Sequence, residues 1–345
     1  MSRVIQIVPE IPPDVGGVAD YAERLKNALA ACGHETLFLA PARRGRPQRT
    51  DLAEFRPSAA ALANTVRAAS AASTGATNVL LHYVGYGFDP RGCPEWLIEG
   101  LEQCTPLFRL TTIFHEIHLS GPPWTVRRWL APKQKSLIRR LSRLSAGRLV
   151  SSPAALEGLH SIDPGCEGRL VATPSNFGEP PRESWPATRR PRAVVLGLPP
   201  VRRRVYGVGL RSVEAFCRRA NVERVHDVGP LIPDTPSSLG GAPVRAHGIL
   251  PSKSVSALLL QCRVVITAYA AGLAAKSGVI AAGMAHGCAV YNCAESLSPN
   301  DECGEWRPAG WDGADWLAAG DAGYTAYHRS RSWNAVAAEV LACLR

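Results

Sequence analysis

A lysine, a serine and a glycine stand at the start of an otherwise apolar helical segment. Lys276, Ser277 and Gly278 follow the strand-like run Arg263–Tyr269 and open the sequence "GVIAAGMAHG". A cation beside the free amides of a helix N-terminus offers a phosphate both a counter-charge and hydrogen-bond donors. The alternative is an ordinary serine cap beside a solvated lysine, and spacing alone does not separate the two.

Two other segments could contact the same kind of ligand. Gly16 and Gly17 precede a helix that carries Asp20, and glycines there let backbone amides approach a ligand closely. Arg203 and Arg204 follow a strand, and ligands of open α/β sheets bind beyond the carboxyl ends of strands. A plain turn and a surface arginine cluster are the alternatives. Together the two helix starts predict a binding site for a diphosphate.

Polar side chains also end two strands of the first half. His115 and Glu116 end "TIFHEIH", and His82 and Tyr86 lie in "LLHYVGYGF". A histidine at such a place can bind a substrate hydroxyl or act as an acid or base. We expect no metal, because His115 and His118 would point to opposite faces of an extended segment, and no helical HExxH is present. Taken singly, each of these residues is more often structural.

Composition and charge bound the class of protein. The 345 residues suit two domains, and the net charge of +10 favours anionic partners. The basic residues are not interleaved with aromatic ones and match no nucleic-acid-binding motif, so we expect no nucleic-acid partner. No apolar run is long enough to span a membrane, and the N-terminus resembles a first strand more than a signal peptide. We therefore expect a cytoplasmic protein.

Residues 125–149 form a basic stretch without an acidic residue. Leu137, Leu141 and Leu144 recur at helical spacing, which predicts a basic amphipathic helix over the stretch. One interpretation is peripheral contact with an anionic membrane, at the inner face of which the protein would then lie. The other is a helix packed on a sheet with its basic face in water.

Strands and helices alternate along the chain, which predicts parallel βαβ units and doubly wound sheets. The Pro-rich, charged segment 179–192 interrupts the alternation and is predicted to be a linker. It separates an N-terminal domain, 1–178, from a C-terminal domain, 193–330, and a helix over 331–345 could pack back on the first domain. Scattered cysteines without a CxxC pair are expected to be structural thiols, in apolar surroundings for Cys32, Cys217, Cys262, Cys288 and Cys343.

The combination of these segments resembles the GT-B glycosyltransferases, and within them the retaining family 4. The likeness covers most of the chain. It rests on "VPEIPPDVGGVADYAERL", "TIFHEIH", "VSSPAALEGL", "SNFGEP" and "KSGVIAAGMAHGCAVYN".

This resemblance implies two Rossmann-like domains facing across a cleft: an N-terminal acceptor domain and a C-terminal nucleotide-sugar domain. It implies transfer of a sugar from a nucleotide-diphosphate donor, as substrate and without a cofactor or metal, to a glycan, lipid-linked or small-molecule acceptor in polysaccharide or glycoconjugate assembly. By position, Gly16, Gly17, Arg203, Arg204, Lys276, Ser277 and Gly278 would bind the donor; His115 and Glu116 would be catalytic; and His82, Tyr86 and Asp20 would meet the acceptor.

The chain departs from this family at two positions. Many relatives carry two glutamates, and here Ala274 and Ala282 stand in their places. The phosphate contacts can persist without these acids, whereas the usual glutamate contacts to the donor ribose and sugar cannot. A catalytically impaired GT-B partner subunit is therefore the main alternative, and a basic nucleic-acid-binding protein is a less favoured one.

Overall fold

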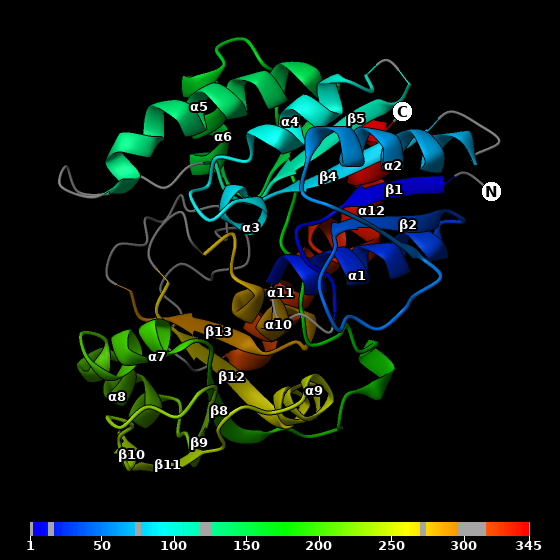
Figure 1. Cartoon of the computed structure of the whole chain (residues 1–345). Coiled ribbons are helices and arrows are strands. Elements are labelled where there is room, and N and C mark those ends of the chain that lie inside the picture. The colour runs from blue at the N-terminus through cyan, green and yellow to red at the C-terminus, as the bar shows by residue number, and fades with distance from the viewer. Residues whose placement is uncertain are drawn as a thin grey trace. The chain divides into compact units, whose positions relative to one another are not determined.

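The computed structural model describes residues 3–12, 17–72, 77–105, 107–117, 126–269, 274–294 and 315–344. The chain divides into two compact units: unit 1 is Met1–Val171 with Val336–Arg345, and unit 2 is Ala172–Ala335. Each unit is built on a largely parallel sheet with helices packed against it (Figure 1). This arrangement confirms the predicted α/β class with two Rossmann-like domains.

Unit 1 contains a seven-stranded parallel sheet in the order β3-β2-β1-β4-β5-β6-β7. The strands β1, β4, β5 and β6 are buried over most of their length, as strands covered on both faces must be, whereas β3 and β7 at the two edges are more exposed. The strands are β1 (Arg3–Ile7), β2 (Glu35–Pro41), β3 (Leu52–Phe55), β4 (Asn78–Tyr83), β5 (Arg109–Phe114), β6 (Gly147–Val150) and β7 (Arg169–Leu170). The helices are α1 (Gly17–Ala31), α2 (Ala59–Ala71), α3 (Gly85–Phe88), α4 (Glu95–Glu102), α5 (Val126–Leu144) and α6 (Pro153–Ile162).

Unit 2 contains a six-stranded sheet in the order β10-β11-β9-β8-β12-β13, parallel except for the β10–β11 pair. Its strands are β8 (Arg190–Leu196), β9 (Arg224–Val228), β10 (Ser238–Leu239), β11 (Ala242–Ala246), β12 (Cys262–Thr267) and β13 (Ala289–Asn292). Its helices are η1 (Arg182–Ser184), α7 (Pro199–Tyr206), α8 (Leu210–Arg219), α9 (Ser252–Gln261), α10 (Gly278–Ala285) and α11 (Trp316–Ser330). β8 thus begins inside the segment 179–192 and pairs with β12 through Arg190 and Cys262.

The strand order reverses once in each sheet, between β1 and β4 in unit 1 and between β8 and β12 in unit 2. At such a point the two connections leave toward opposite faces, and a crevice opens beyond the carboxyl ends of the two strands. These two places are where the topology favours a ligand.

The last helix, α12 (Trp333–Leu344), belongs to both units. The indole Nε1 of Trp333 donates to the Ser175 carbonyl in unit 2 at 3.0 Å. Near its other end, the Cys343 carbonyl accepts a 3.0 Å hydrogen bond from Thr111 Oγ1 of β5 in unit 1. Gly147 leaves room for this contact, because a Cβ there would lie 2.7 Å from the same hydroxyl.

Some boundaries differ from the sequence prediction. The basic helix ends at Leu144 and not at residue 149, because 147–150 pair with β5 as strand β6. The strand predicted through residue 118 ends at Phe114, which leaves His115 in a bend. Cys32 is exposed just after α1, whereas the other four cysteines predicted in apolar surroundings are buried.

A fully buried ion pair joins α7 to β9 in the core of unit 2. Arg202 Nε and Nη2 donate to the two carboxylate oxygens of Asp227 at 2.9 and 2.5 Å, and both side chains are inaccessible. Tyr206 donates its hydroxyl to the same carboxylate. Arg202 Nη1 also donates to the Pro230 carbonyl at 2.6 Å, so one guanidinium ties the loop after β9 to α7.

Replacing Asp227 with Asn should strongly destabilise the protein. The amide keeps the size of the carboxylate but leaves the Arg202 charge buried without compensation, which costs about 3–5 kcal/mol. Urea unfolding followed by circular dichroism measures the change. The matched control is Asp321→Asn, which breaks an exposed pair with Arg182 and should cost at most about 1 kcal/mol. Equal losses for the two variants would contradict this assignment.

Candidate functional site

Three side chains form a hydrogen-bonded row beside the strand-order reversal of unit 1. Gln6 of β1 and His82 of β4 are fully buried on neighbouring strands, and His115 follows β5 and is half-buried. His82 Nε2 lies 2.7 Å from Gln6 Oε1, and His82 Nδ1 lies 3.0 Å from His115 Nε2. The two imidazole rings are stacked, with centroids 5.3 Å apart.

The row determines the tautomers of both histidines. Because the Gln6 carbonyl oxygen can only accept, His82 Nε2 must carry the proton and its Nδ1 must accept. His115 Nε2 is then the donor to His82. Burial, and next the positive charge that His115 can carry, hold the pKa of His82 well below its ordinary value. His82 therefore stays neutral and fixes which nitrogen of His115 is protonated.

Tyr21 of α1 closes one side of this row. Its ring lies edge-on to His115, with centroids 5.1 Å apart, and edge-on to His82 at 5.9 Å. Tyr21 was not singled out from the sequence, because an aromatic residue one turn into an amphipathic helix is typical of a core. The ring limits the movement of His115, whose main-chain amide is also held by the Tyr83 carbonyl at 3.1 Å.

A shallow depression next to this row brings together two of the other predicted residues. Glu116 and Tyr86 both line it, together with Gln134 of α5. Gln134 Nε2 donates to the Tyr86 hydroxyl at 3.2 Å and to the Arg91 carbonyl at 3.1 Å. Glu116 is exposed and Tyr86 is half-buried, so both side chains have surface that a ligand could reach.

The remaining predicted residues of unit 1 lie at the start of α1. Gly17 is its first residue and is exposed, and a Cβ there would meet nothing within 4 Å. Packing therefore does not require glycine at position 17. Asp20 is exposed in the first turn of the helix, while Gly16 lies outside the described residues. Contacts of Gly17 and Asp20 with a donor or an acceptor stay predictions.

In unit 2 the predicted Lys276–Gly278 segment forms the start of α10, beside the β8–β12 reversal. Ser277 is the N-cap and is buried, and its Oγ accepts from the Ile280 amide at 3.1 Å. Lys276 and Gly278 are half-buried. The first-turn amides of a helix have no intrahelical acceptor and attract an anion. Lys276 thus stands directly before the start of α10, and contact of this segment with a donor diphosphate stays a prediction.

Two residues that the sequence did not reveal brace this part of unit 2: one contacts Ala275, next to Lys276, and the other contacts Tyr269, just after β12. Arg331, after α11, donates to the Ala275 carbonyl next to Lys276. Asn292, at the end of β13, accepts from the Tyr269 amide and donates to the Tyr269 carbonyl, each at 3.0 Å. Both residues are distant in sequence from the segments that they brace, so no local pattern could have identified them.

The three consecutive arginines of α7 differ in burial and in pairing. Arg202 is the buried partner of Asp227, whereas Arg203 and Arg204 are exposed in the last turn of the helix. Neither of these two forms an ion pair with a carboxylate among the described residues. Their charges are therefore available to a ligand, but they lie at the far end of α7 from the end of β8, and their donor contact stays a prediction.

The two alanines that replace the family glutamates lie in the apolar core of unit 2. Ala274 is 2% exposed and Ala282 is inaccessible, and all residues from Val279 to Ala285 are buried. A carboxylate at position 282 would be buried among apolar side chains, which is unfavourable without a partner. Alanine at this position is therefore consistent with how α10 packs in this chain.

Three cations of the basic helix α5 pair with carboxylates of unit 1. Lys133 pairs with Glu95 at 2.7 Å, Arg140 with Glu102 at 2.8 Å and Arg143 with Asp163 at 3.3 Å. Leu137, Ile138 and Leu141 enter the core. Trp129, by contrast, is 80% exposed. In the described ranges, no helix is both long enough and apolar enough to cross a bilayer.

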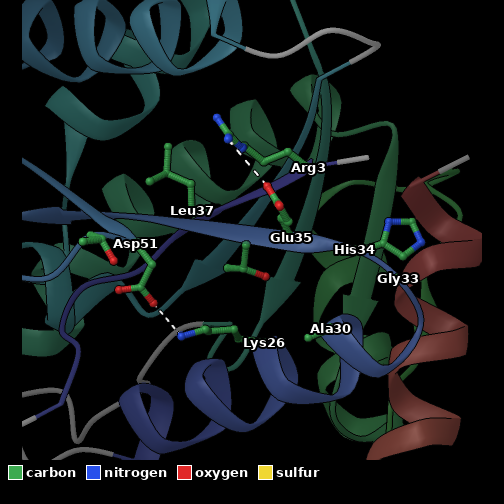
Figure 2. Close-up of a pocket in the computed structure, with 10 residues that line it drawn as sticks. Arg3, Lys26, Ala30, Gly33, His34, Glu35, Leu37 and Asp51 are labelled. Atoms are coloured by element: carbon green, nitrogen blue, oxygen red, sulfur yellow. Dashed lines mark hydrogen bonds and ion pairs between the residues drawn. The ribbon is translucent and has the colours of Figure 1, made fainter. Parts of the chain in front are cut away.

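A separate cavity of about 510 Å³ lies in unit 1 at the amino ends of β1 and β2 (Figure 2). Its charged groups face one another: Lys26 binds Asp51 at 2.6 Å, and Arg3 lies 3.6 Å from Glu35. The cavity thus lies at the sheet edge opposite the His82–His115 row, and its charges are already compensated. It does not form part of the candidate site.

Known structures identify the fold. TarM superposes with a TM-score of 0.61 at 9% identity, covering 100% of this chain and 99% of that one. Sucrose-phosphate synthase from Thermosynechococcus elongatus gives 0.59 at 13%, covering 99% and 98%, and an alpha-glucosyltransferase in complex with UDP gives 0.59 at 10%, covering 100% and 99%. No protein-family model and no curated protein sequence matches the chain. The chain has the GT-B fold, as the sequence predicts.

Acidification should destabilise the protein below about pH 6.5. His82 and His286 are buried and neutral; burial lowers the pKa of His286 to about 4 and also holds the pKa of His82 well below its ordinary value. As the pH falls below about 6.5, these imidazoles become protonated in the unfolded chain but stay neutral in the folded chain. The free energy of unfolding therefore falls between about pH 6.5 and 4. Each histidine contributes up to about 1.4 kcal/mol per pH unit.

Urea unfolding at several pH values measures this slope. His286→Gln should reduce it, whereas replacing the exposed His160 by Gln should leave it unchanged. A slope identical in all three proteins would contradict the assignment of buried neutral imidazoles.

The tautomer of His115 is a second prediction of this geometry. In the neutral form its proton should reside on Nε2 and its lone pair on Nδ1, since His82 Nδ1 is the acceptor. Long-range ¹H–¹⁵N NMR of the imidazole rings distinguishes the two tautomers. Gln6→Leu removes the group that orients His82 and should give a mixture. A purely Nδ1-protonated His115 in the unaltered protein would contradict the row as described.

Proposed function

We propose that this protein is a metal-independent glycosyltransferase that moves a sugar from a nucleotide-diphosphate donor to a hydroxyl of an acceptor. The proposal rests on one observation: in a chain with the GT-B fold, a lysine and a capped helix start lie together at the β8–β12 reversal of unit 2. The solved alpha-glucosyltransferase of this fold contains UDP. We extend the proposal to the retaining family 4 on the sequence resemblance.

In this proposal unit 2 holds the donor diphosphate. Negative charge grows on the leaving diphosphate as the glycosidic bond breaks, and fixed donors that already face this position lower the barrier. Lys276 supplies charge, and the Gly278 amide and its neighbours in the first turn supply hydrogen bonds. Arg203 and Arg204 add positive charge, while Arg331 and the Ser277 cap keep the segment in one conformation.

Unit 1 supplies His115 and the acceptor contacts. Because its Nε2 is bound to His82, any proton transfer by His115 goes through Nδ1. His82 was predicted to contact the acceptor, but it is inaccessible and both of its ring nitrogens are engaged. We assign it instead as the residue that positions His115. Glu116 and Tyr86, which share one depression, are the proposed catalytic carboxylate and acceptor contact.

The class of acceptor is proposed from the basic segment of unit 1. We propose a glycan or lipid-linked acceptor, met at the inner face of a membrane by residues 125–149. The exposed Trp129 supports such a contact, whereas the ion pairs along α5 reduce the charge that would attract anionic lipid. An alpha-glucosyltransferase of this fold has been solved with UDP and a 13-mer DNA, so DNA belongs in any acceptor screen.

Binding of nucleoside diphosphates tests the proposal. Calorimetry with UDP, GDP, ADP and TDP should show binding by at least one of them, and Lys276→Ala should weaken it by about 1–3 kcal/mol, as loss of a charge-assisted hydrogen bond does. Lys253→Ala, at an exposed position of α9, is the matched control and should change nothing. Absence of binding by all four would remove the basis of the proposal.

If the chain binds a nucleoside diphosphate but transfers no sugar, the alternative of a GT-B partner subunit would be supported. The replacement of both family glutamates by buried alanines favours this alternative. Sugar transfer or donor hydrolysis by the isolated chain, lost in His115→Ala while diphosphate binding persists, would exclude it.

A further inference from the structure

A cavity of about 390 Å³ lies in unit 2 at the amino ends of β8, β12 and β13. This is the sheet edge opposite α10's first turn and the proposed donor seat. Its walls come from the 182–189 segment, from β12 and from the first turn of α11. The volume is in the range of small-molecule pockets, roughly 300–1,000 Å³.

Positive charge in this cavity is only partly compensated. Three arginines and one aspartate are among the lining residues, so two positive charges remain. Asp321 binds Arg182 at 2.8 Å, and the buried Arg189 donates to the carbonyls of His286 and Cys262 at 2.6 and 3.2 Å. Arg263 forms no ion pair with a described carboxylate.

Arg263 is held in a fixed orientation. Its guanidinium carbon lies 4.4 Å over the ring of Trp316, and its Nε donates to the Arg189 carbonyl at 3.1 Å. Stacking on an aromatic ring fixes the plane of a guanidinium while its remaining N–H groups can still bind an anion. Trp316 and Leu317 are also the first residues of α11, a helix start that adds to the positive potential.

Trp185 lines the cavity, and its ring is held in place by its neighbours. The indole Nε1 of Trp185 is buried and has no hydrogen-bond partner in the part of the chain that the structure describes. The ring cannot easily turn to find one, because Arg189 lies 4.6 Å over it and Tyr324 packs edge-on at 4.8 Å. Gly287, at φ +63°, is close enough that a Cβ would lie 2.0 Å from the ring.

We propose that this cavity binds the phosphate group of a small phosphorylated molecule, at a site separate from the sugar-transfer site. A phosphate monoester carries nearly two negative charges, which match the two uncompensated positive charges of the lining, and its oxygens can accept from the Arg263 guanidinium. Planar guanidinium groups suit phosphate oxygens geometrically. The site does not depend on the proposed donor chemistry, since none of its lining residues belongs to the 276–278 segment.

Calorimetry on the full chain at fixed ionic strength tests the proposal, with ribose 5-phosphate, inorganic phosphate and neutral ribose as probes. Binding of ribose 5-phosphate but not ribose is expected. Arg263→Gln should weaken it at least about tenfold, as loss of a charged hydrogen bond does. Arg190→Gln removes the same charge from an exposed position on the same edge and should have no effect. If inorganic phosphate also binds, the phosphate alone is the recognised group. If only ribose 5-phosphate binds, the sugar contributes to recognition. Either outcome supports the site.

A second readout does not rely on a variant of Arg263. Trp185→Phe keeps an aromatic ring and removes only the N–H, so it assigns the Trp185 indole resonance in ¹⁵N spectra of the unaltered protein. That resonance should shift on addition of ribose 5-phosphate. An unmoved resonance, unchanged affinity in Arg263→Gln, or binding lost in Lys276→Ala but kept in Arg263→Gln would overturn the proposal.

Discussion

The hydrogen bond between His82 and His115 is the interaction on which the candidate site of unit 1 depends. It exists because β4 and β5 are parallel neighbours, so that the end of one strand lies beside the end of the next. The β1–β4 pairing places Gln6 one strand further along, where its carbonyl oxygen orients His82. An imidazole that would be costly to bury alone is thereby satisfied at both nitrogens. The strand order thus places the three polar side chains where they can satisfy one another's hydrogen bonds.

In unit 2 the edge of the sheet at the carboxyl ends of the strands is organised differently. There the carboxyl ends of the strands are braced by long side chains that reach back from helices: Arg202 to the Asp227 carboxylate and the Pro230 carbonyl, and Arg331 to the Ala275 carbonyl. Gly229 fits beneath this bracing, because a Cβ there would lie 2.6 Å from Arg202 Nη1. Backbone carbonyls that would otherwise lack donors are satisfied, and Ala275 before α10 and the loop after β9 are held without help from a ligand.

Much of the fold follows from local sequence, and less of the site does. The alternation of apolar strand runs with amphipathic helices predicts the two sheets, and Ser277 before an apolar helix predicts its cap. The three arginines from 202 to 204 look alike in sequence, however, and only the turn of α7 decides that Arg202 faces Asp227. His82 has the sequence setting of an accessible strand end, yet its neighbours on β1 and β5 bury it. Partners such as Arg331 and Trp185 depend on contacts far along the chain, which periodicity does not encode.

The C-terminal helix imposes an order on biosynthesis. Unit 2 is a continuous stretch of chain, whereas unit 1 includes Val336–Arg345 along with the first half. On the ribosome, the sheet of unit 1 therefore emerges before its last helical segment, and the Thr111 hydroxyl of β5 lacks the Cys343 carbonyl until the whole of unit 2 has been translated. During this interval the nascent first half lacks its C-terminal partner and is the part that a chaperone would protect.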